Sequence, residues 1–95
     1  MKFIAFYEYK FEDIDKVLEK GAQALAIREK APERFPKAIF DFNIVGETKG
    51  VAMFETDSPD QLCNLALHNA PELTCKFMPI LDSAKSAELY KKLKK

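Results

Sequence analysis

Apolar and polar residues recur with two different periods along this chain. Short runs rich in aromatic and β-branched residues, bounded by polar or turn-forming residues, predict strands. They lie at residues 2–9, 37–45, 51–56 and 73–81. Longer segments with apolar residues three and four positions apart predict helices. They lie at residues 13–30 and 59–69, and a short basic helix is expected from Ser83 onward. The predicted order is therefore βαββαβ followed by a C-terminal helix.

This order predicts an α+β fold of the ferredoxin-like type. Its four-stranded antiparallel sheet would have the strand order 4-1-3-2, with two helices on one face. Pro79 supports this order, because proline cannot donate to a strand ladder and belongs on an edge, and strand four is an edge here. The 95 residues are expected to form a single domain, residues 1–95.

The two predicted helices differ in how clearly their ends and faces are marked. Residues 58–61, Ser-Pro-Asp-Gln, predict the start of the second helix, with Ser58 as N-cap and Gln61 closing a capping box. In the first helix, Gly21 is expected to permit a close approach to the sheet. The expected buried stripe of that helix is Ile14, Val17, Leu18, Gly21, Ala22 and Leu25. Ile27 and Leu67 lie off the main stripes of their helices.

The first strand predicts a second copy of the chain as a partner. Residues 2–9 are apolar on both faces, with Phe3, Ala5 and Tyr7 on one and Ile4 and Phe6 on the other. Two helices cover only one face of a four-stranded sheet, so the other face needs another cover. We therefore expect a homodimer in which the two sheets face each other.

The register of the central hairpin decides which polar residues share a face. An odd-length connection at residues 46–50 would place Asp41 opposite Glu55 and Asn43 opposite Met53, on the face away from the helices. It would collect Phe40, Phe42, Ala52 and other apolar residues on the helix face, and the hydrophobic pattern favours it.

Under that register, five residues are candidates for a site between the two sheets. Two close, partly desolvated carboxylates, Asp41 and Glu55, would shift one pKa upward and could act as a general acid or base. Their alternative is a solvated rim position. Asn43, Tyr7 and Met53 are the candidate ligand-binding residues of the same cavity.

The composition of the chain restricts which metal, redox and membrane functions are expected. One histidine (His68, expected at the surface) and two separated cysteines match no metal or redox spacing, so neither a metal nor a cofactor is expected. Cys63 and Cys75 should remain unpaired in a cytoplasmic protein.

No apolar run approaches the roughly 20 residues of a membrane span, and no signal peptide is evident at the N-terminus. The composition therefore predicts a cytoplasmic protein with no membrane partner.

Nucleic acid is also not an expected partner. RNA-recognition domains share the βαββαβ order, and residues 49–56 partly match their third-strand signature. However, Val51 and Met53 stand where stacking aromatics are needed. Fifteen basic and fifteen acidic residues cancel, although residues 82–95 carry a net +3 and residues 1–81 a net −3.

Several segments resemble a family of short proteins of unknown function within the dimeric α+β barrel superfamily. They are residues 55–57, the helix start Ser58-Pro59, residues 77–82 and the opening residues 1–4. The resemblance implies a homodimer whose sheets enclose a small cavity, and no assigned reaction. Relatives in the superfamily include muconolactone isomerase-like enzymes, cofactor-free oxygenases, haem-degrading oxygenases and ligand-binding modules. The poor facing of His68 argues against haem.

Two functions remain open from the sequence. The first is a cofactor-free isomerase or oxygenase acting on a small cyclic or carbonyl compound, with Asp41 or Glu55 as proton shuttle. The second is a non-catalytic dimeric ligand-binding or stress-response module. Convergent buried carboxylates would favour the enzyme.

Overall fold

The computed structural model describes residues 1–94. Its strands are β1 (Lys2–Tyr9), β2 (Lys37–Asn43), β3 (Lys49–Glu55) and β4 (Leu73–Ile80). Its α-helices are α1 (Ile14–Lys30), α2 (Pro59–Asn69) and α3 (Ser83–Leu93), and two short 3-10 turns are η1 (Phe11–Asp13) and η2 (Pro32–Arg34). The predicted order of elements is confirmed.

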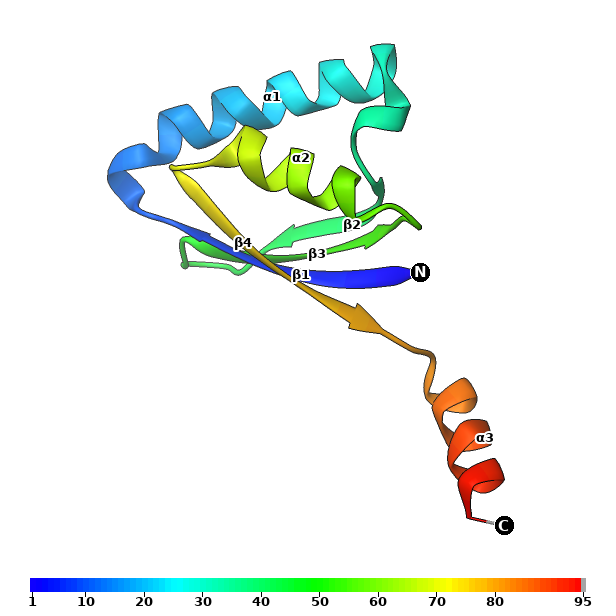
Figure 1. Cartoon of the computed structure of the whole chain (residues 1–95). Coiled ribbons are helices and arrows are strands. Elements are labelled where there is room, and N and C mark those ends of the chain that lie inside the picture. The colour runs from blue at the N-terminus through cyan, green and yellow to red at the C-terminus, as the bar shows by residue number, and fades with distance from the viewer. Residues whose placement is uncertain (95) are drawn as a thin grey trace.

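The four strands form one antiparallel sheet in the order β2-β3-β1-β4. This is the predicted order 4-1-3-2 counted from the other edge, and Pro79 lies on the edge strand β4 as expected. Helices α1 and α2 both cover the same face of the sheet (Figure 1). The architecture is therefore two-layered, with one sheet face left without helices.

The core lies between this sheet and the two helices. Small residues at the centre of the sheet, Ala5 and Ala52, are almost fully buried, which lets the helix layer approach closely. The buried core cluster consists of Ala5, Ala24, Phe35, Ala52, Phe54 and Leu65. Tyr7, Ile27 and Phe77 pack against it while remaining partly exposed.

The prediction for the buried face of α1 was wrong in part. Ala24 is the buried residue of this helix and Ile27 packs against the core, whereas Leu18 and Leu25 are each 66% exposed. A Cβ at Gly21 would meet nothing within 4 Å, so this glycine does not serve a close approach to the sheet. Apolar residues occupy most of the circumference of α1, so periodicity alone does not select which stripe faces the core.

The start of α2 is also stabilised differently from the prediction. Ser58 is the N-cap residue and Pro59 follows it, but the Ser58 side chain makes no capping hydrogen bond. The buried Thr56 Oγ1 instead accepts from the Ser58 backbone N–H at 2.9 Å, and Gln61 Nε2 donates to the Glu33 carbonyl at 2.7 Å. Gln61 is therefore used to join α2 to η2, and the predicted capping box does not form.

The predicted register of the β2–β3 hairpin was wrong. Asp41 lies opposite Ala52 and Asn43 opposite Gly50, with a bulge between Ala38 and Phe40. The Ile44 N–H donates to the Lys49 carbonyl at 2.9 Å, so the connection is residues 45–48, an even number. Gly46 supplies the positive φ of 79° that this turn requires.

The register change exchanges the two faces of β2. Phe40 and Phe42 lie on the face away from the helices, where their rings stack 5.2 Å apart, and Asp41 lies on the helix side. Ala52 and Phe54 of β3 face the helices as predicted. The error arose because the apolar side of β2 was assigned to the helices, whereas both faces of this sheet carry apolar residues.

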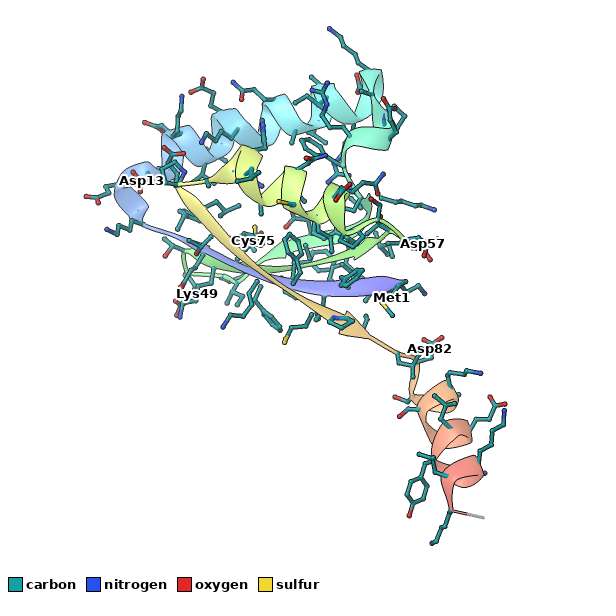
Figure 2. The ribbon with its side chains drawn as sticks, in the orientation of Figure 1. Met1, Asp13, Lys49, Asp57, Cys75 and Asp82 are labelled. Atoms are coloured by element: carbon teal, nitrogen blue, oxygen red, sulfur yellow. The ribbon has the colours of Figure 1, made fainter. Side chains whose placement is uncertain are left out.

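Helix α3 leaves the sheet at Asp82, on the side opposite α1 and α2 (Figures 1 and 2). All of its residues are exposed. The radius of gyration of the chain is 15.6 Å, which exceeds the roughly 12 Å expected for a compact chain of this length. The projecting helix accounts for the difference.

Candidate functional site

The face of the sheet without helices carries two consecutive rows of side chains that are apolar except for Lys76. Strand pairing places Phe40, Met53, Ile4 and Met78 side by side in one row, and Phe42, Val51, Phe6 and Lys76 in the next. We call these eight residues the open face. Phe42 is 63% exposed and Phe6 46% exposed, so this face is a large apolar surface in contact with solvent.

Charged residues border the open face at both ends. At the hairpin end Lys49 lies opposite Glu8, and at the other end Glu55 lies opposite Lys2. Lys37 of β2 also lies opposite Glu55, so each end carries side chains of both signs on neighbouring strands. A face with both signs at both ends can be placed against a copy of itself without forcing like charges together.

A hollow of about 320 Å³ lies at the hairpin end of the open face. Residues at alternate positions along each strand place their side chains around this hollow. The residues between them contribute the strand segments that connect these positions. The lining residues are Phe6, Tyr7, Glu8, Ile44, Lys49, Gly50, Thr74, Cys75 and Lys76. The volume is at the lower end of the range of small-molecule sites.

Two of the predicted site residues, Tyr7 and Asp41, contact each other on the helix-covered side of the sheet. The Tyr7 hydroxyl donates to Asp41 Oδ1 at 2.7 Å. The Tyr7 ring crosses Gly50 to reach this carboxylate, and Gly50 is buried beneath it. Asp41 is not among the residues that line the hollow. This hydrogen bond fastens the edge strand β2 to β1 across β3.

Burial on the helix side holds several groups in one protonation state. Partial burial and the Asp41 carboxylate raise the pKa of Tyr7 well above its usual value. Burial, with a smaller contribution from Asp41, raises the pKa of the Cys75 thiol to about 11. Figure 2 shows Cys75 on β4 between the sheet and the helix layer. The phenol and the thiol are therefore neutral at neutral pH.

Arg28 of α1 lies close to the same region. Its guanidinium donates to the Pro36 carbonyl and lies over the rings of Phe35 and Phe54, 5.5 and 5.7 Å from their centroids. Burial lowers its pKa, and the nearby Asp41 carboxylate partly opposes this effect. Arg28 thus packs the helix layer onto the start of β2.

The remaining predicted site residues lie apart from this pair. Glu55 is on the face opposite Asp41, so the two carboxylates do not form the predicted pair. Asn43 Nδ2 donates to the carbonyls of Ile44 and Glu47, each at 3.3 Å, and so stabilises the hairpin turn. Met53 lies at the centre of the open face, as predicted.

His68 is half-buried between the helices, and not at the surface as expected. Its Nε2 lies 2.9 Å from the Lys20 carbonyl, to which it can donate, and its ring packs against Phe35 with centroids 5.6 Å apart. Its position joins α2 to α1. Neither Cys63 nor Cys75 forms a disulfide. Within residues 1–94, no cluster of three or more His, Cys, Asp or Glu side chains could hold a metal ion, and no helix is long and apolar enough to cross a membrane.

Sequence reasoning did not single out the residues that line the hollow on the open face. Phe6 and Glu8 of β1 and Lys76 of β4 were available from the alternation of side chains along each strand. Their convergence with Lys49 depends on the pairing of β1 with both β3 and β4. The signal was therefore present in each strand, but the combination required the sheet.

Comparison with known families matches residues 1–94 to a domain of unknown function, DUF3303. The chain belongs to this family. A search of curated protein sequences finds no significant match. Membership in DUF3303 agrees with the resemblance noted above to a family of unknown function and carries no assigned reaction.

Proposed function

We propose that two copies of this chain pack their open faces together and bind a small cyclic carbonyl or carboxylate compound in the cavity between the sheets. The observation that supports this most directly is the apolar open face. Its two rows, which include Phe6 and Phe42, are left uncovered by residues 1–94. Contiguous exposed apolar patches of this kind are typical of interaction surfaces.

The arrangement favours a second copy as the cover. Sheets that pack face to face lie about 10 Å apart and interdigitate their side chains, which the protruding Phe6, Phe42 and Met78 can supply. A two-fold axis brings the same surface of each chain together, and the charge pattern at both ends of the open face permits this. The product would be a dimeric α+β barrel.

The hollow at the hairpin end provides the binding chemistry. Lys49 and Lys76 can donate hydrogen bonds to a carboxylate or carbonyl oxygen. The Thr74 hydroxyl donates to the Glu8 carbonyl at 3.3 Å, so it can accept a hydrogen bond from a ligand donor. Phe6 and Ile44 supply apolar contact for a ring. In the dimer, the partner sheet would close the hollow and exclude water from the ligand.

The same geometry favours binding over catalysis. The predicted proton shuttle required Asp41 and Glu55 to be close together, and they lie on opposite faces of the sheet. The carboxylate at the hollow is Glu8, which lies opposite Lys49 and not opposite a second carboxylate. We therefore place the non-catalytic ligand-binding module ahead of the isomerase or oxygenase.

Native mass spectrometry of the purified full chain tests the dimer and any co-purified ligand together. We expect a mass of twice 10.8 kDa, with an additional mass for a small molecule. Thermal shift with a panel of small aromatic and cyclic carboxylates then tests the ligand class. Stabilisation should be lost in Lys76→Met but kept in the matched control Lys91→Met on α3. A monomer at every micromolar concentration would contradict the dimer, and equal responses of both variants would contradict the site.

A further inference from the structure

Helix α3 presents an apolar surface that no other part of the described chain covers. Leu89, Tyr90 and Leu93 are exposed, Tyr90 by 61% and Leu93 by 85%. Among the described residues, α3 makes no substantial contact with another element. An isolated helix of this length is marginally stable in water, so α3 is expected to need a packing partner.

The two sides of α3 differ in character. Leu89 and Leu93 are four positions apart and Tyr90 precedes Leu93 by three, so the three side chains share one side of the helix. On the other side, Glu88 lies 3.9 Å from Lys85 and 3.8 Å from Lys92. The charged side is therefore suited to solvent, and the apolar side to a protein surface.

A second exposed apolar stripe lies on the outer side of α1. Leu18, Ala22 and Leu25 follow one another at helical spacing and are all exposed. Asp15 and Glu29 continue the same spacing at its two ends. This outer stripe of α1 is thus apolar in the centre and acidic at both ends. The apolar side of α3 is flanked by lysines, so the two surfaces have complementary charges.

The geometry points to docking of α3 on the outer stripe of α1 in a second copy of the chain. Helix α3 cannot reach this stripe in its own chain without crossing the sheet, because it projects on the opposite side (Figure 1). That is the side on which the second copy lies in the proposed dimer, so this inference rests on the proposed function. Each chain of the proposed dimer would therefore contact its partner through its C-terminal helix.

The distribution of charge supports a second copy as the docking partner. Residues 82–95 carry a net charge of +3, and residues 1–81 carry −3. The segment is therefore attracted to the body of a second copy, and repelled by the corresponding segment of that copy.

Tryptophan fluorescence of the full chain carrying Tyr90→Trp tests the docking, because the natural chain contains no tryptophan. Sedimentation of the same samples reports the oligomeric state. At concentrations where the dimer forms, we expect blue-shifted emission that moves to longer wavelength as dilution dissociates the dimer. Adding Leu25→Glu should expose the indole and raise the dimer dissociation constant about tenfold or more, because a leucine that docking would bury is replaced by a charge.

Leu67→Glu is the matched control, because Leu67 of α2 is exposed to a similar degree (68%) but lies outside the outer stripe of α1. It should leave both the emission and the dissociation constant unchanged. A dimer whose indole remains solvent-exposed would overturn the docking and leave the proposed dimer intact. A dimer with buried indole in Leu25→Glu would overturn the α1 stripe as the docking surface. A monomer at every concentration would overturn both proposals.

Discussion

The Tyr7 hydroxyl donates a 2.7 Å hydrogen bond to the Asp41 carboxylate, and so joins β1 to β2 over the intervening strand β3. The ring can cross β3 because residue 50 is a glycine. A Cβ at that position would lie 2.1 Å from Tyr7 Cζ, which no side-chain packing permits. The pair therefore secures an edge strand that carries Phe40 and Phe42 on its other face.

Gly50→Ala should destabilise the chain, because the added methyl displaces the Tyr7 ring and breaks the bond to Asp41. We expect a loss of about 1–3 kcal/mol in the free energy of unfolding, measured by urea denaturation. Gly21→Ala is the matched control: it is exposed in α1 with nothing within 4 Å, and should stabilise by about 1 kcal/mol or less. Equal effects of the two substitutions would contradict the close packing at Gly50.

The raised pKa of Tyr7 predicts a specific loss of stability at alkaline pH. The folded value lies above the unfolded value near 10, so the contribution is fully present below pH 10 and decreases as pH rises further. Denaturation midpoints of the natural chain should therefore fall more steeply above about pH 10 than those of Tyr7→Phe. Tyr9→Phe, from the same strand, should retain the steep fall. Parallel curves for the natural chain and Tyr7→Phe would argue against the hydrogen bond.

The two cysteines should differ strongly in reactivity. Cys63 is exposed, whereas Cys75 is partly buried with a pKa raised to about 11, which keeps its reactive thiolate scarce at pH 8. Alkylation of the folded chain at pH 8, followed by peptide mass spectrometry, should modify Cys63 first and Cys75 only slowly. In urea both should react at similar rates. Rapid modification of Cys75 in the folded chain would show that β4 opens readily.

The contact between Lys20 and Glu72 predicts how the stability of the chain changes at acid pH. Its ammonium lies 2.5 Å from Glu72 Oε1 and donates to the Ala70 carbonyl at 2.6 Å, and the pKa of Glu72 is lowered mainly by the Lys20 hydrogen bond. A lowered folded pKa gives stability that is present above the ordinary value and is lost as pH falls. Lys20→Met should therefore reduce stability at pH 7 and flatten the acid decline below about pH 5.

Lys85→Met is the control for Lys20→Met, because Lys85 of α3 pairs with the exposed Glu88 at 3.9 Å, away from Glu72, and such pairs contribute little. Its pH profile should match that of the natural chain. Thermal melts between pH 3 and pH 7 measure both variants. If the two substitutions give the same profile, the Lys20–Glu72 contact does not form in solution.

If the dimer forms through the open face, a charge placed on that face should prevent dimerisation. Phe42→Glu places a charge within the proposed dimer contact, so it should convert a dimer into a monomer in sedimentation experiments. The monomer should keep its fold, because Phe42 is 63% exposed and outside the core cluster. A dimer that survives this change would place the contact elsewhere.

The order of elements could be predicted because its signals are local. Strand and helix periodicities, the Ser58-Pro59 helix start and the edge position of Pro79 depend on a few neighbouring residues, and each agrees with the structure. The burial of α1 could not be predicted in the same way. Leu18 and Leu25 have the hydrophobicity of core residues, and only the placement of the helix on the sheet leaves them exposed.

The position of the candidate site was decided by register, which is a tertiary property. The even-length turn at residues 45–48 and the bulge at Ala38–Phe40 turn Asp41 toward the helices, and a one-residue change exchanges the faces of a strand. Sequence reasoning named Tyr7 and Asp41 but had no means of joining them. Their hydrogen bond requires three strands in order and a glycine in the middle one, and only the assembled sheet brings these conditions together.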